Sequence, residues 1–89
     1  MAEGDLQKKV GRNIRSYRQK RGLSQEAFAE VLGIHRTYMG GLERGERNLT
    51  LRSLERIAEQ MSVEVEELMR RGAALALVLF PKYSYKNVA

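Results

Sequence analysis

The segment HRTYMGGLERG, residues 35–45, places two adjacent glycines among residues that favour a helix. At about 100° per residue, one set of positions falls within an arc of roughly 140° and forms what we call the outward face: Arg36, Thr37, Gly40, Gly41 and Arg44. An arginine can donate two hydrogen bonds to guanine O6 and N7, and a threonine methyl can contact the thymine methyl. Each glycine costs a helix about 0.8–1.0 kcal/mol relative to alanine, so we expect the pair to allow close approach. The pattern predicts a face that reads base edges in the DNA major groove, the alternative being a frayed helix end.

Residues that can bind phosphate flank the outward face. Gln25 lies at the start of a predicted helix, where free N–H groups and the helix dipole favour an anion. His35 precedes the face and can contact the DNA backbone, cap the helix, or do neither. Arg44, Arg47 and Asn48 surround the next turn. Each is weak evidence alone, but together they predict the phosphate contacts of a duplex-binding site.

Two charged residues stand where apolar ones are expected. Arg18 continues the apolar row of Leu6, Val10 and Ile14, and Glu43 lies on the inward side of the helix that carries the outward face. An unpaired charge in a protein interior is costly. The spacing therefore predicts a buried ion pair between Arg18 and Glu43, with two solvated charges as the alternative.

Helical periodicity predicts the elements that position these side chains. The first helix lies within residues 6–22 and stops at Gly22. Ser24 can cap a second helix that Gly33 ends. The apolar faces of these two helices are predicted to be inward: Leu6, Val10, Ile14 and Tyr17 in the first, and Ala27, Phe28, Val31 and Leu32 in the second.

Three further helices follow. One runs from about residue 36 to 43 before Gly45, and Thr50 can cap the next. A short fifth helix, residues 65–71, ends at Gly72. The fourth has inward residues at helical intervals: Leu51, Leu54, Ile57, Ala58 and Met61. Short connections between helices are typical of a compact bundle, so the fold is predicted to be all-α with five helices.

Composition limits the possible functions. The 89 residues suffice for one small domain, here placed at residues 1–72. With no cysteine and one histidine, little material exists for a metal site or a nucleophile–base pair, so we expect neither cofactor nor enzymatic activity. The formal charge is +5, with basic residues concentrated in residues 1–22 and acidic ones in residues 55–67. Such polarity either presents a basic end to a polyanion or belongs to an ordinary solvated surface.

The last residues, 73–89, form an apolar extension. The run AALALVLF is far shorter than the ~20 residues of a membrane-spanning helix, and the polar start does not resemble a signal peptide. We therefore expect a cytoplasmic protein without a membrane partner. The run cannot be assigned to helix or strand by its period, and Pro81 breaks it. The extension is predicted to mediate self-association, unless it folds back onto its own domain.

The sequence also resembles a known family. GLSQEAFAEVLGIHRTYMGGLERGERNLTLRSLERIAEQM is similar to the helix-turn-helix domains of phage repressor and Cro-like transcription regulators. The resemblance rests on a glutamine opening the first motif helix, a small residue, a turn glycine and inward apolar residues: Gln25, Ala29, Gly33, Met39 and Leu42. HRTYMGGLERGERNLTLRSLE looks closer still to the controller proteins of bacterial restriction–modification systems.

This resemblance, which covers roughly residues 6–70, implies a lambda-repressor-like bundle whose third helix enters the major groove. It also implies a homodimer on a pseudo-palindromic operator, with half-sites about one helical turn, ~34 Å, apart. It implies base-facing positions for Arg36, Thr37 and Gly41, and a buried ion pair between Arg18 and Glu43. The positions near phosphates would be Gln25, His35, Tyr38, Arg44, Arg47 and Asn48.

Together these observations predict a dimeric regulator that binds double-stranded DNA in a sequence-specific way and controls its own operon. Depending on where its site lies, it would block RNA polymerase or contact it. The alternative is an antitoxin-type interaction module whose C-terminal extension binds a partner protein.

Overall fold

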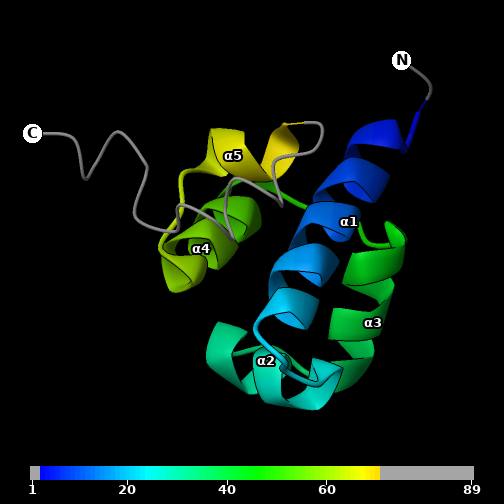
Figure 1. Ribbon diagram of the computed structural model, residues 1–89. Coiled ribbons are helices and arrows are strands. Elements are labelled where there is room, and N and C mark those ends of the chain that lie inside the picture. Colours follow the sequence, from blue (N-terminus) through cyan, green and yellow to red (C-terminus); the bar gives the residue numbers. More distant parts are fainter. Residues whose placement is uncertain (1–2, 71–89) are drawn as a thin grey trace, which may run out of the picture.

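The computed structural model describes residues 3–70, which form five helices and no strand (Figure 1). The helices are α1, Asp5–Lys20; α2, Gln25–Leu32; α3, Arg36–Arg44; α4, Leu51–Met61; and α5, Val65–Met69. The predicted all-α class with five helices is confirmed. The predicted extension, residues 73–89, lies outside the described residues. None of the helices between residues 3 and 70 combines the length and apolar character needed to cross a bilayer.

The predicted caps determine where the helices begin and end. The Ser24 hydroxyl accepts a hydrogen bond from the backbone N–H of Ala27 at 3.0 Å, and Thr50 accepts one from Ser53 at the same distance. Gly33 and Gly45 follow α2 and α3 with φ of 70° and 76°. Residues with a Cβ atom rarely adopt this left-handed backbone conformation, which is why glycine ends both helices.

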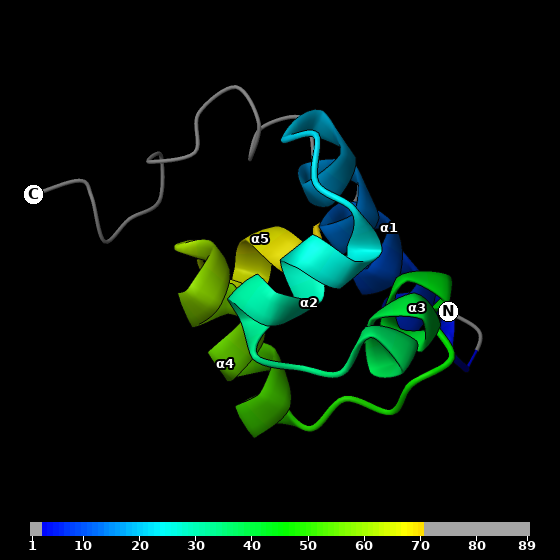
Figure 2. The same cartoon turned by 90° about the horizontal axis from the view of Figure 1, so that it is seen from below.

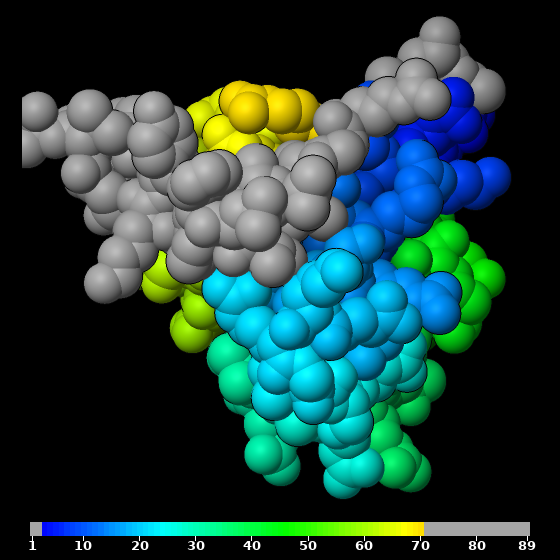
Figure 3. All heavy atoms as spheres, in the orientation of Figure 1, coloured from blue at the N-terminus to red at the C-terminus, as the bar shows by residue number. Residues whose placement is uncertain are grey.

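The bundle is built around α1. This helix packs against α3 and α5, while α2 packs against α3 and α4. In Figure 2, which is seen from below, α2 lies in the middle of the view and α3 lies to its right. In Figure 3, α1 and the start of α2 fill the middle of one face, and α3 emerges along its side. The most deeply buried large side chains come from α1, α2, α3 and α5: Val10, Ile14, Phe28, Met39, Leu42 and Leu68.

Three residues predicted to be inward are exposed instead. Leu6 is 39%, Val31 49% and Leu51 84% exposed. Leu6 and Leu51 lie in the first turns of their helices. Val31 lies about 200° around α2 from Ala29, and Ala29 is buried. The burial of this small residue therefore turns Val31 toward solvent.

Candidate nucleic-acid interface

A buried ion pair joins α1 to α3, the helix that carries most of the candidate interface. Arg18 Nε lies 2.6 Å from Glu43 Oε2, and Arg18 Nη2 lies 3.0 Å from Glu43 Oε1. The two side chains are 11% and 2% exposed. This two-point geometry is the strongest form of an arginine–carboxylate contact. The ion pair expected from the sequence is therefore present, and it fixes α3 against α1.

Two further hydrogen bonds extend the pair to α2. Arg18 Nη1 donates to the carbonyl oxygen of Leu23 at 2.8 Å, just before α2. Gln25 Nε2 donates to Glu43 Oε1 at 2.9 Å. Gln25, predicted to bind phosphate, is thus hydrogen-bonded to the buried carboxylate in the free protein. Its amide helps to set the position of α2 relative to α3.

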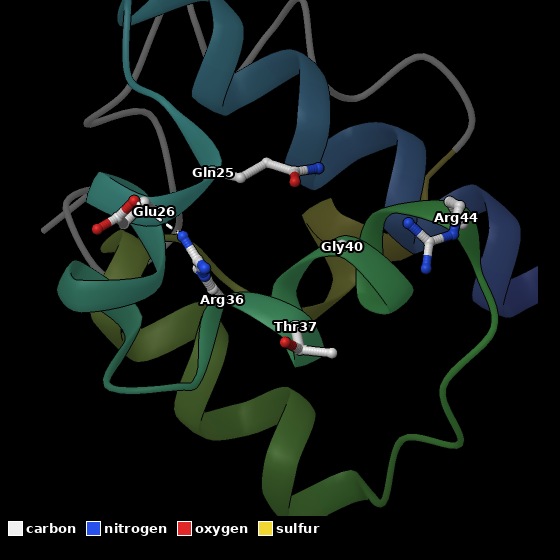
Figure 4. A pocket seen from close by; sticks show the side chains of 6 residues that line it. All are labelled: Gln25, Glu26, Arg36, Thr37, Gly40 and Arg44. Atoms are coloured by element: carbon white, nitrogen blue, oxygen red, sulfur yellow. Dashed lines mark hydrogen bonds and ion pairs between the residues drawn. The ribbon is translucent and has the colours of Figure 1, made fainter.

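The outward face of α3 borders a hollow of about 440 Å³ (Figure 4). Arg36 and Thr37 begin one side of this hollow, and Arg44 lies at its far end, with Gly40 between them. Arg36, Thr37 and Arg44 are all exposed, whereas the opposite side of α3 carries the buried Met39 and Leu42. The structure therefore brings these polar residues together on an accessible surface.

Each of the two arginines that line the hollow, Arg36 and Arg44, faces a carboxylate. Arg36 Nη1 lies 3.4 Å from Glu26 Oε2, and Arg44 Nε lies 3.0 Å from Glu46 Oε1. All four side chains are at least 60% exposed. Exposed pairs of this kind contribute only about 0–1 kcal/mol, so a phosphate or a base edge can readily replace the carboxylate. Neither carboxylate was predicted from the sequence. The run ERGER places Glu46 two residues after Arg44, whereas Glu26 is ten residues from Arg36 and has no such local signal.

The two glycines of α3 are covered by side chains of the same protein. Gly40 and Gly41 are both buried. A Cβ atom at Gly40 would lie 3.1 Å from Arg44 Nη1, and one at Gly41 would lie 2.6 Å from Arg47 Nε. Gly41, predicted to face bases, is instead covered by an arginine from the loop after α3. The glycine pair thus leaves room for two arginine side chains of the same protein.

The remaining predicted residues lie at both ends of α3. His35 Nδ1 accepts a hydrogen bond from the backbone N–H of Thr37 at 3.1 Å, so the histidine caps α3 in the free protein. Tyr38 is half-buried, and the Arg47 guanidinium carbon lies 5.3 Å from the centre of its ring. Asn48 is exposed in the loop between α3 and α4.

Comparison with known proteins identifies similar chains. A family model described as helix-turn-helix matches residues 14–68, which include α2, α3 and the Arg18–Glu43 pair. The chain is 45% identical over 67 residues to control protein C.SmaI of Serratia marcescens, covering 75% of this chain and 80% of that protein. It is 32% identical over 60 residues to the immunity repressor protein of Bacillus phage phi105, covering 67% of this chain and 42% of that protein.

A solved structure shows the same relationship. The crystal structure of the restriction-modification controller protein C.AhdI from Aeromonas hydrophila superposes with a TM-score of 0.62 at 40% identity. The match covers 70% of this chain and 94% of that one. The resemblance inferred from residues 22–61 is confirmed.

Proposed function

Because this chain belongs to the helix-turn-helix family of DNA-binding transcription regulators, we propose that it binds a pseudo-palindromic operator as a homodimer in the cytoplasm. In this proposal α3 lies in the major groove and α2 lies across the phosphate backbone. One observation carries the proposal: α3 has one side fixed in the core by Met39, Leu42 and Glu43, and presents Arg36, Thr37 and Arg44 to solvent.

The side chains divide into two roles. Arg36 donates to guanine O6 and N7, and Thr37 contacts a thymine methyl or a base edge. The phosphate-binding role falls to residues at the ends of α2 and α3: Gln25, His35, Tyr38, Arg44, Arg47 and Asn48. Such contacts fix the register of the protein on the duplex but do not read sequence. On binding, Arg36 and Arg44 exchange Glu26 and Glu46 for groups of the DNA.

Dimerisation sets the spacing of the operator. We assign dimerisation to residues 73–89. Two copies related by a twofold axis would place their α3 helices about one helical turn of DNA, ~34 Å, apart. A bound dimer then represses transcription where its site overlaps the promoter, and activates it where the site lets the protein contact RNA polymerase. We further propose that the operator lies next to the gene of the regulator itself. Similarity to proteins described as controllers supports the regulatory role.

Selection of bound sequences from random DNA tests this function directly. The expected result is a palindrome with half-sites one helical turn apart. Affinity for it should fall steeply with salt, because each neutralised phosphate releases counterions. Absence of any enriched sequence, or a flat salt response, would contradict the proposal. Purification of the chain with a stoichiometric partner protein and without DNA binding would instead support the antitoxin-type alternative.

A further inference from the structure

Gly41 lies in the interior of α3, where a glycine weakens the helix. A Cβ atom here would lie 2.6 Å from Nε, 3.2 Å from Cγ and 3.3 Å from Cδ of Arg47. These three atoms are consecutive along the Arg47 side chain. The stem of Arg47, and not only its tip, therefore crosses the helix at this glycine.

The charged end of the same arginine has a second contact. The Arg47 guanidinium carbon lies 5.3 Å from the centre of the Tyr38 ring, within the range of a cation–π interaction. Tyr38 and Gly41 are three residues apart, so they are neighbours on the surface of α3. Arg47 remains exposed, so its N–H groups are accessible to a ligand.

We propose that Gly41 is a positioning residue for Arg47: by lacking a side chain, it lets the arginine lie along α3 toward Tyr38, aligned to bind a DNA phosphate. This inference rests on the proposed function. A long side chain that is already ordered loses less freedom when DNA binds. The alignment should be worth about 2- to 12-fold in affinity, the equivalent of ordering one such side chain.

The neighbouring glycine provides a matched control. A Cβ atom at Gly40 would meet Nη1 of Arg44 at 3.1 Å and Oε1 of Gln25 at 3.7 Å, both at the ends of flexible side chains. Gly40→Ala and Gly41→Ala are thus the same chemical change at adjacent positions of one helix. Only the second displaces Arg47.

A double-mutant cycle tests the coupling. Affinity for the selected operator is measured for Gly41→Ala, Arg47→Ala and the double variant. We expect Gly41→Ala to weaken binding in the parent chain and to have no further effect when Arg47 is already alanine. The effect of Gly40→Ala, whatever its size, should be the same with and without Arg47. Independent effects of Gly41→Ala and Arg47→Ala would overturn the proposal.

Nuclear magnetic resonance of the free protein tests the alignment without DNA. The Tyr38 ring current should shift the side-chain proton signals of Arg47, and this shift should disappear in Gly41→Ala but persist in Gly40→Ala. Persistence in both variants would overturn the inference even if DNA binding is confirmed. Conversely, if the parent chain binds no DNA, the proposed function fails while this comparison still decides the position of Arg47.

Thermal melting by circular dichroism completes the design. Both variants should melt at or above the parent temperature, because alanine favours a helix over glycine and exposed Arg47 is free to move aside. Loss of the exposed Arg47–Tyr38 contact costs about 0.5–1 kcal/mol, no more than the helix propensity that alanine adds. A melting temperature for Gly41→Ala below that of the parent would therefore contradict the premise that only Arg47 is displaced.

Discussion

Gly11 of α1 lies directly against the main chain of Glu43 in α3. A Cβ atom at position 11 would be 2.6 Å from the Glu43 carbonyl oxygen and 2.5 Å from that of Leu42. Two helical turns further along α1, Arg18 holds the Glu43 carboxylate. α1 therefore contacts α3 through the backbone and the side chain of the same residue.

Substitution of Gly11 tests this close contact. In Gly11→Ala the new methyl group meets backbone atoms, which cannot rotate away as a flexible side chain does. We expect the free energy of unfolding to fall by about 1–3 kcal/mol, although alanine favours a helix over glycine by about 1 kcal/mol. Urea denaturation followed by circular dichroism measures the change. Gly40→Ala serves as the control, and equal denaturation midpoints for the two variants would show that the helices do not meet at Gly11.

Removal of the Arg18 guanidinium should lower the stability of the fold more than the substitution of Gly11 does. Arg18→Ala leaves the Glu43 carboxylate, 2% exposed, with no cation beside it. Breaking such a pair typically costs about 3–5 kcal/mol, so the melting temperature should fall sharply. Arg15→Ala removes an exposed arginine of the same helix and should change stability by no more than about 0.5 kcal/mol. Similar melting temperatures for the two variants would mean that the ion pair does not stabilise the fold.

His35 allows capping to be separated from phosphate binding. His35→Ala removes the acceptor for the Thr37 N–H and should lower the free energy of unfolding by about 0.5–2 kcal/mol. Asparagine is a good cap, so His35→Asn should restore stability. If the asparagine variant is stable but binds the operator weakly, the histidine also contacts DNA. An alanine variant as stable as the parent would refute the capping role.

Arg36 and Arg44 should have different effects on specificity. Arg36→Ala should cost about 1–3 kcal/mol in binding and relax the preference at one base pair of each half-site. Arg44→Ala should weaken binding to all sequences alike and lower the salt slope by about 1. Competition with operators substituted one base pair at a time measures both effects. If Arg36→Ala lowers the affinity for every operator by the same factor, Arg36 does not read a base.

Local features of the fold are predictable from the sequence because they depend on residues close together in the chain. The caps at Ser24 and Thr50 involve N–H groups three residues away. The Arg18–Glu43 pair is long-range, but a charge on an apolar helix face requires a partner, and only a limited set of inward acids is available. Both kinds of feature follow from residue type and spacing.

Contacts made by other segments are not predictable in this way. A helical wheel gives the direction of Gly41 but not the loop arginine that covers it. It places Leu51 on an apolar stripe, yet the residue lies in the first turn of α4 and is 84% exposed. The role of Gly11 is likewise hidden, because it depends on how closely α3 approaches α1.

The attachment of α3 through its main chain and Glu43 has an evolutionary consequence. The side chains at positions 36, 37 and 44 are exposed and contribute little to the packing of the bundle. They are therefore free to diverge while the scaffold is inherited unchanged. If α3 reads DNA as we propose, descendants of this protein would acquire new target sequences by exchanging residues 36 and 37, without any compensating change in the interior.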